Sequence, residues 1–167
     1  MPRKLTIGTD LTLPRSIGPL IDMLVYARHT THLAIEGLTA AQLDHRHDAQ
    51  SNSIGALLLH IAAVELWYQA HTFEGRAWTA EEDAQWLAWV ELRGTVTGRP
   101  LEFYLDTLDS IRARTESELR ARDDEWLLRI EPFEGTDANN YWKWFHVCED
   151  EINHRGQIRW LRKRLPA

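Results

Sequence analysis

The chain has 167 residues, of which 44% are hydrophobic, and its formal net charge is −6. This length fits a single domain over residues 1–167 with a full apolar core, and the acidic balance argues against a nucleic-acid partner, which normally requires a basic surface. The sequence contains no run of about 18 apolar residues, which excludes a transmembrane helix. A single cysteine, Cys148, excludes an internal disulfide and a cysteine-rich zinc site. Because residues 1–20 show no signal peptide, we expect a cytoplasmic protein with no membrane association.

In chain order, apolar residues recur at helical spacing, and β-branched runs bounded by turns are scarce. A first helix is expected over about 17–36, followed by a polar, turn-rich segment over 38–50. Residues 51–53 offer capping side chains, so a second helix should begin near Ile54 and continue to about His71.

Three further helices are expected, over 81–92, 101–120 and 140–164. Residues 123–136 contain Pro132 and Gly135 and are predicted to form a long connection, with a short extended piece at 126–130. Four principal helices, with long connections and short extra helices, predict an all-α fold of the four-helix-bundle type.

The last predicted helix carries His146, Asp150 and His154 at intervals of four residues, a spacing that returns side chains to nearly the same face. Because residues eight apart are separated by roughly 12 Å along the axis, His146 and His154 can hardly bind the same ion. The face of His154 also carries apolar residues: Val147, Ile158, Leu161 and Leu165. Asp150 and His154 therefore interrupt a stripe that should face the core, where an unpaired charge is costly.

On the second helix, His60 interrupts an apolar face in the same way, beside Leu57, Val64 and Trp67. One metal ion held by His60, Asp150 and His154 would satisfy all three polar groups and leave coordination positions open. Two other interpretations stay open. His60 can be a hydrogen-bonded core histidine, and Asp150 and His154 can form a helix-stabilising ion pair.

Other residues near Asp150 have less specific patterns. Glu149 and Glu151 flank it but lie on other faces, so they are expected at the surface or behind the ligands. His146 is interpreted as a pocket residue in preference to a helix-capping group.

A second apolar strip, roughly opposite His154, contains Phe145, Cys148, Ile152 and Gly156. It predicts packing against another helix, which a homodimer would supply, and makes Cys148 a packing residue.

Two segments resemble the signature motifs of one superfamily. The run from Asn52 to His60 (NSIGALLLH) is similar to the second-helix motif of the DinB-like superfamily, and the run from His146 to Ile158 (HVCEDEINHRGQI) resembles its last-helix motif. The resemblance spans essentially the whole chain. It implies a four-helix bundle, often dimeric, with a metal ion held by three histidines.

By motif position, the resemblance places the three metal ligands at His60, position 150 and His154. This sequence departs from the motif at position 150, where Asp150 replaces the usual histidine. The change gives a set of two histidines and one carboxylate. The implied cofactor is one divalent transition metal, with nickel or zinc favoured and iron or manganese as alternatives. The alternative is that the replacement of histidine by Asp150 has weakened or abolished metal binding.

Activities in the superfamily include thiol-dependent S-transfer and isomerisation, and hydrolase activity has been suggested. The resemblance therefore implies a metal-dependent enzyme, either a thiol S-transferase or a hydrolase, whose partners are a small-molecule substrate and a low-molecular-weight thiol. The alternative is a non-enzymatic stress-response or ligand-binding bundle whose metal is structural or lost. The sequence alone names no catalytic residue.

Overall fold

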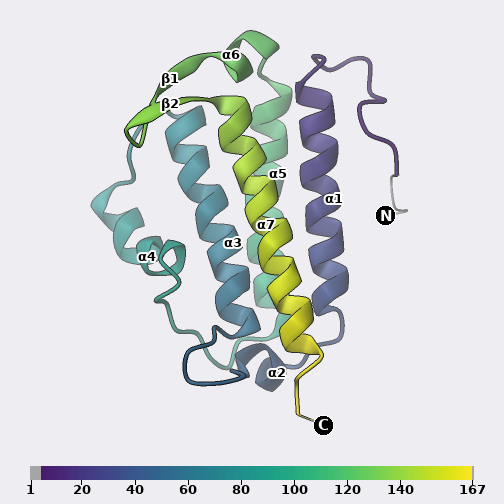
Figure 1. Cartoon of the computed structure of the whole chain (residues 1–167), viewed down its shortest axis with the longest axis vertical. Coiled ribbons are helices and arrows are strands. Elements are labelled where there is room, and N and C mark those ends of the chain that lie inside the picture. Colours follow the sequence, from purple (N-terminus) through teal and green to yellow (C-terminus); the bar gives the residue numbers. More distant parts are fainter. Residues whose placement is uncertain (1–4, 167) are drawn as a thin grey trace.

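Four long helices form the body of the protein, and the computed structural model describes residues 5–166. These helices are α1 (Ile17–Ile35), α3 (Ile54–Tyr68), α5 (Leu101–Arg120) and α7 (Asn140–Arg162). They run side by side along the long axis, with α7 packed against α1 and α3 and with α5 behind, against the same two helices (Figure 1). The predicted all-α four-helix bundle is confirmed. None of the described helices combines the length and the apolarity needed to cross a membrane.

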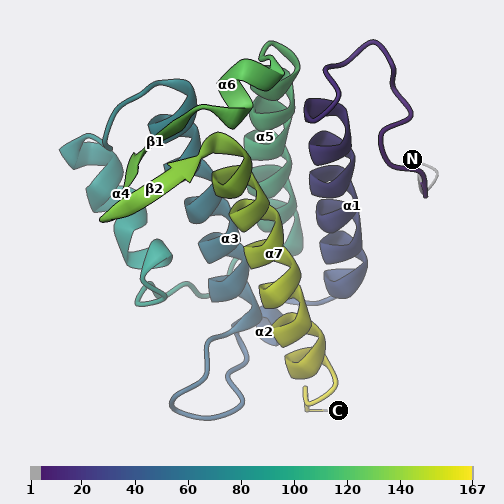
Figure 2. The same cartoon turned by 45° about the horizontal axis from the view of Figure 1, so that its top comes forward.

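Short elements connect the long helices and cover the ends of the bundle. They are α2 (Ala40–Asp44), the π-helical turn η1 (Gln69–Phe73), α4 (Ala80–Val90), α6 (Asp124–Leu128), β1 (Ile130–Phe133) and β2 (Thr136–Asn139). The two strands pair in antiparallel fashion, with Ile130 opposite Asn139. Figures 1 and 2 show this hairpin and α6 at one end of the bundle, α2 at the other, and α4 outside α3.

Two segments differ from the sequence prediction. Residues 126–130 were expected to be extended, but they include the end of α6 and the first residue of β1. The Asp123 side chain caps α6 by accepting a hydrogen bond from the Trp126 amide at 2.8 Å. The polar segment 38–50 contains the short helix α2, which begins at a capping box made by Thr39 with Gln42. Both errors concern helices of one turn, whose apolar pattern is too short to detect.

The core consists of two apolar clusters between the long helices. The first includes Ile54, Leu58, Tyr104, Leu108 and Ile158. The second includes Leu20, Leu24, Tyr68, Trp144 and Val147. Along each long helix, residues of one cluster precede residues of the other, so the clusters occupy different levels of the bundle.

Four buried charged residues, one from each long helix, lie between the levels of the two clusters. We call Arg28, Glu65, Arg112 and Glu151 the ionic quartet. Arg28 donates hydrogen bonds to Glu65 at 2.8 Å and to Glu151 at 2.9 Å. Arg112 donates to Glu65 at 2.7 Å and to Glu151 at 2.8 Å. The two positive and two negative charges balance, so the quartet ties all four helices together without a net buried charge.

Further hydrogen bonds complete the quartet. Arg28 donates to the carbonyl of Leu108, Arg112 donates to the carbonyl of Leu24, and the Thr115 hydroxyl donates to Glu65. Burial alone would raise the pKa of Glu65, yet the guanidinium groups of Arg112 and Arg28 lower it to about 2. The Glu65 carboxyl is therefore ionised at neutral pH.

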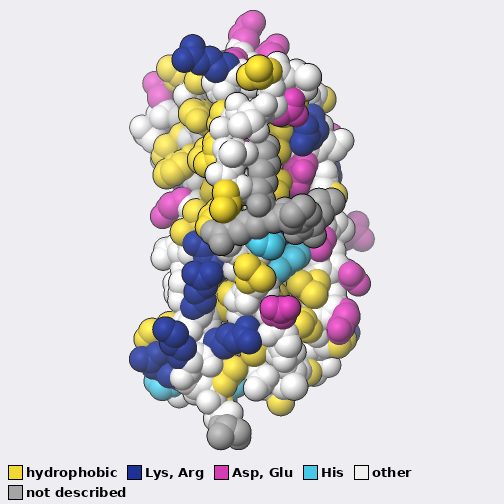
Figure 3. All heavy atoms as spheres, turned by 90° about the vertical axis from the view of Figure 1, so that its right-hand side faces the viewer, with side chains coloured by type: hydrophobic (Ala, Val, Ile, Leu, Met, Phe, Trp, Pro, Cys, Tyr) yellow, Lys and Arg dark blue, Asp and Glu magenta, His cyan; other side chains and the backbone are white. Residues whose placement is uncertain are grey.

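Arginines of α7 also fix this helix to α1. Arg162 donates to the carbonyls of Ala34 at 2.8 Å and Glu36 at 2.9 Å, which belong to the end of α1 and its cap, where carbonyls lack helical partners. Arg155 donates to the Thr30 hydroxyl. Basic side chains gather in the lower half of the face shown in Figure 3. Part of the basic run of α7 thus has a structural role.

Two residues at the beginning of the NSIGALLLH run, Ser53 and Gly55, have structural roles in α3. The Ser53 side chain caps α3 by accepting a hydrogen bond from the Ala56 amide at 3.1 Å. Gly55 lets Tyr104 of α5 approach closely, because a Cβ atom at position 55 would lie 2.5 Å from the tyrosine hydroxyl. Tyr104 is fully buried, so its ring has no free space into which to move.

We expect Gly55→Ala to lower the free energy of unfolding by about 1–3 kcal/mol, the usual cost of overpacking a core. Gly156→Ala is the matched control, since it also adds a methyl group to a glycine within a long helix but meets nothing within 4 Å. This control should stabilise the protein by about 0.5–1 kcal/mol. Urea unfolding of both variants measures the difference, and equal effects would contradict the close approach of Tyr104.

Candidate metal centre

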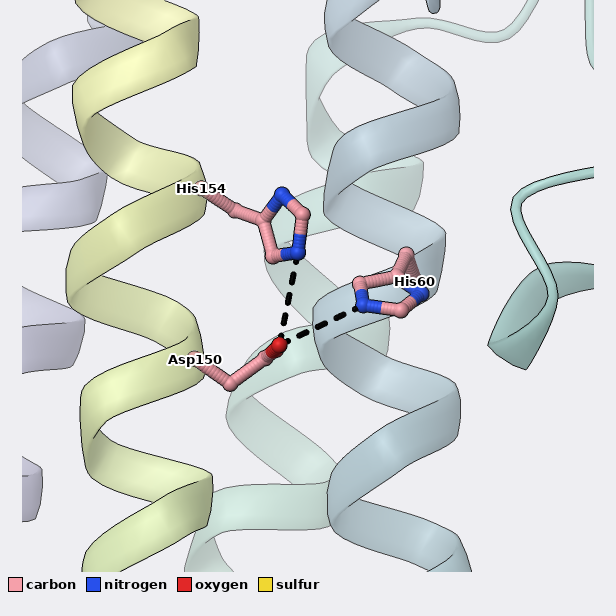
Figure 4. A group of neighbouring side chains, drawn as sticks. All are labelled: His60, Asp150 and His154. Carbon is pink, nitrogen blue, oxygen red and sulfur yellow. Dashed lines mark hydrogen bonds and ion pairs between the residues drawn. The ribbon is translucent and has the colours of Figure 1, made fainter.

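The structure brings His60, Asp150 and His154 together between α3 and α7. His60 comes from α3 and the other two from α7, and all three side chains point toward one another (Figure 4). The Asp150 Oδ1 atom lies 3.4 Å from His60 Nε2 and 3.3 Å from His154 Nε2. One ligand atom from each residue lies within 4.8 Å of the other two, so the group could hold a metal ion.

Local helix geometry and burial position these side chains. Asp150 and His154 are neighbours on one face of α7 because they are four residues apart. His60 and His154 are each 7% exposed, and the Asp150 side chain is 14% exposed. The Asp150 carboxylate is therefore the part of the site most open to solvent.

A backbone carbonyl orients His60. Its Nδ1 atom lies 2.9 Å from the carbonyl oxygen of Trp89 in α4. When Nδ1 carries the proton and donates it to this carbonyl, Nε2 presents a lone pair to Asp150. The Trp89 ring is held against Gly94, where a Cβ atom would come within 2.2 Å of the ring. Sequence analysis missed the role of Trp89 because its carbonyl carries no side-chain signal.

The charges of the three groups depend on one another. Burial alone would raise the pKa of Asp150, but hydrogen bonds from His154 and His60 hold it well below its ordinary value. Burial alone would lower the pKa of His60, but Asp150 outweighs it and raises that pKa. Asp150 is therefore a carboxylate at neutral pH, and it attracts positive charge into the space between the histidines.

These residues fit a metal ion. Two donor atoms bound at about 2.1 Å to one tetrahedral ion lie about 3.4 Å apart. The two distances from Asp150 Oδ1 to the imidazole nitrogens, 3.3 and 3.4 Å, agree with this value. With its Nδ1 proton donated to Trp89, His60 would place a lone pair against a carboxylate oxygen, an unfavourable contact that either a second proton on Nε2 or a metal ion between the two atoms relieves. The Nδ1 atom of His154 is buried and has no hydrogen-bond partner among the described residues.

An aromatic group lies beside the metal centre toward the beginning of α7. The His146 ring stacks on Trp142, with centroids 5.5 Å apart, and meets the edge of Tyr68 at 5.9 Å. Its Nδ1 atom lies 3.2 Å from Glu149 Oε2. His146 does not belong to the group of possible ligands, in agreement with the spacing argument.

Other predicted residues of α7 lie as follows. Glu151, expected at the surface or behind the ligands, is fully buried in the ionic quartet. Cys148 is buried in the second core cluster, and burial raises the pKa of its thiol to about 11, so it is a packing residue and not a nucleophile. Phe145 and Ile152 are 54% and 41% exposed. Their contact with another helix, and with it the homodimer, stays a prediction.

Comparisons with known proteins support the fold and point to a family. A family model described as "MST: Mycothiol-S-transferase" matches residues 19–167. A solved structure described as the conserved protein of locus from Enterococcus faecalis is similar, with a TM-score of 0.65 and 16% sequence identity over 86% of this chain and 93% of that chain. At this identity the likeness concerns the fold alone. No curated protein matches the chain significantly in sequence.

Proposed function

Because this chain belongs to the mycothiol-S-transferase family, a DinB-like family, we propose that it is a metal-dependent enzyme that transfers a low-molecular-weight thiol to a small electrophilic molecule. The observation that carries this proposal is the convergence of His60, Asp150 and His154 on one point between two helices. The family description favours S-transfer over hydrolysis and over a bundle without catalytic activity.

His60 Nε2, Asp150 Oδ1 and His154 Nε2 would hold one divalent transition metal. Two imidazoles and a carboxylate suit zinc or nickel, with iron and manganese as alternatives. Such an ion, when bound, lowers the pKa of a coordinated thiol and so supplies a thiolate at neutral pH. Asp150 contributes one negative charge, which offsets half of the charge of a divalent ion.

Residues around the site support this chemistry. The Trp89 carbonyl keeps His60 Nε2 directed into the site, and the burial of both histidines limits access of water from the core side. Trp142 and His146 lie two turns and one turn before Asp150 on α7, and their stacked rings offer a flat surface to an apolar electrophile.

The proposal is tested on full-length protein purified without a metal-affinity tag. We expect about one equivalent of a transition metal by elemental analysis, and transfer of mycothiol to an electrophile that chelation abolishes and the same metal restores. His154→Ala should lose both metal and activity, whereas His29→Ala, a histidine of α1 outside the site, should lose neither. Absence of metal after addition of nickel, zinc, iron or manganese would refute the proposal. Bound metal whose removal unfolds a protein without transferase activity would assign the ion a structural role.

A further inference from the structure

A pocket of about 520 Å³ is bordered by the β1–β2 hairpin and the beginning of α7. We call it the hairpin pocket, and Figures 1 and 2 show the two elements next to each other. Its lining includes two acidic side chains, Glu134 and Asp137, and three large apolar ones, Ile130, Phe133 and Trp142. The volume lies in the range of small-molecule binding sites. None of the described residues that line it belongs to the candidate metal centre, so it is a separate site.

The apolar part of the hairpin pocket is exposed but well supported. Ile130 is 69% exposed and Trp142 is 47% exposed, although proteins usually bury most of such side chains. The Trp142 ring packs against Phe133, with centroids 5.9 Å apart, and stacks on His146. Phe133 in turn contacts Trp67 of α3, also at 5.9 Å. These contacts hold the rings in place, so a flat ligand can pack on Trp142 at a small cost in side-chain entropy.

The charges that line the hairpin pocket are negative only. Glu134 and Asp137 are exposed, and neither forms an ion pair or a side-chain hydrogen bond with another described residue. No lysine, arginine or histidine is among the described lining. Lys143 lies over the Phe133 ring, 5.1 Å from its centroid, but Glu131 lies 3.7 Å from its Nζ atom and balances its charge. The pocket therefore attracts positive charge.

The hairpin fixes the positions of the two acidic residues. Glu134 and Gly135 both have positive φ angles, 49° and 81°, as the two central residues of a tight hairpin turn require. Asp137 follows within β2. Burial raises the pKa of the Tyr68 hydroxyl, and the carboxylates of Glu134 and Asp150 raise it further. The electric field of Glu134 thus reaches the aromatic side chains beside the pocket.

An exposed aromatic ring beside unpaired carboxylates suits one class of ligand. The face of an aromatic ring attracts a cation, and tryptophan is the best side chain for this contact. The carboxylates add an attraction that a neutral ligand lacks and that an anion would meet as repulsion. The apolar side chains favour a ligand with a flat apolar body.

We propose that the hairpin pocket binds aromatic organic cations, with Trp142 as the ring contact and with Glu134 and Asp137 as the charge partners. This binding goes beyond the proposed function. It depends neither on a metal ion nor on thiol transfer, because the residues that carry it lie outside the metal centre.

The test uses the full-length protein and three indoles that share a ring system and differ in charge. At neutral pH tryptamine is a cation, tryptophol is uncharged and indole-3-acetate is an anion. Each is titrated by ¹H–¹⁵N NMR, with the indole N–H of Trp142, assigned with Trp142→Phe, as the reporter. We expect saturable binding of tryptamine with a Kd of about 1 mM, as is usual for so small a ligand. Tryptophol should bind about ten-fold more weakly, and indole-3-acetate should not saturate.

Substitutions separate the contribution of charge from that of the ring. Glu134→Gln and Asp137→Asn should each weaken tryptamine binding about three-fold, as expected for an exposed ion pair, and leave tryptophol binding unchanged. Trp142→Ala should weaken the binding of both, with the Ala138 amide as the reporter in this variant. Glu102→Gln is the control for net charge and should change neither affinity, because it removes an exposed carboxylate of α5 outside the pocket.

The outcomes separate this proposal from the proposed function. Tryptamine binding that persists in His154→Ala supports the hairpin pocket whether or not the protein is a transferase. Loss of binding in that variant, with its fold intact, would place the cation at the metal centre and overturn the proposal. Equal affinities for tryptamine and tryptophol would also overturn it, as would chemical-shift changes confined to another surface. So would full tryptamine affinity in a variant that combines Glu134→Gln with Asp137→Asn.

Discussion

Arg112→Met is expected to lower the free energy of unfolding by about 3–5 kcal/mol, a large part of the stability of a domain of this size. The substitution leaves two buried carboxylates, Glu65 and Glu151, with only Arg28 as a counter-ion. It also removes the hydrogen bond to the Leu24 carbonyl. Urea unfolding followed by circular dichroism gives the change, by linear extrapolation to zero denaturant.

A neighbouring arginine provides the control for this experiment. Arg114 lies on the same helix and pairs with Glu74, but both side chains are partly exposed. Arg114→Met should therefore cost less than about 1 kcal/mol. If Arg112→Met does not fold, Arg112→Lys keeps the charge and loses the forked geometry, and an intermediate loss is expected. Equal stabilities of Arg112→Met and Arg114→Met would contradict the structural importance of the ionic quartet.

Asp150→Ala is expected to reduce metal affinity by on the order of 100-fold or more, since changes to residues that only support a ligand already cost roughly 10–100-fold. Competition with a chromophoric chelator measures the affinity, and circular dichroism checks the fold. Glu149→Ala is the matched control, because it removes the adjacent, exposed carboxylate, which lies outside the group. Unchanged affinity in Asp150→Ala would mean that this carboxylate is not a ligand.

A second substitution at position 150 restores the residue that is usual in the DinB-like motif. Asp150→His restores the three histidines that the DinB-like motif implies and should retain the metal. Its affinity should fall as the pH drops below about 6.5, where imidazoles become protonated and can no longer bind. Failure of this variant to bind metal while its fold is intact would show that the site is adapted to a carboxylate.

Sequence reasoning succeeded where the signal is local. The four long helices were predicted because each carries several turns of apolar periodicity, and the beginning of α3 was predicted from capping residues such as Ser53. Two of the candidate ligands, Asp150 and His154, were found because one helical turn relates them. The position of His60 opposite them was inferred from its place on an apolar face and from the family motif, and the structure places it there.

What sequence reasoning missed depends on contacts between distant segments. Arg28 and Glu151 are separated by 123 residues, and no periodicity links them. Glu151 was assigned to a different face from Asp150, which is correct, but that face is covered by α1 and α5 and not by solvent. The carbonyl of Trp89 reaches His60 only because α4 folds back along α3.

The adjacent residues Asp150 and Glu151 have consequences for how this protein can evolve. Glu151 fixes the rotation of α7 through the ionic quartet, and Glu65 does the same for α3, the helix that carries His60. The distance between the helices that bear the candidate ligands is thus set by residues that take no part in binding. We therefore expect that a candidate ligand such as Asp150 can be exchanged by mutation without repacking the interior.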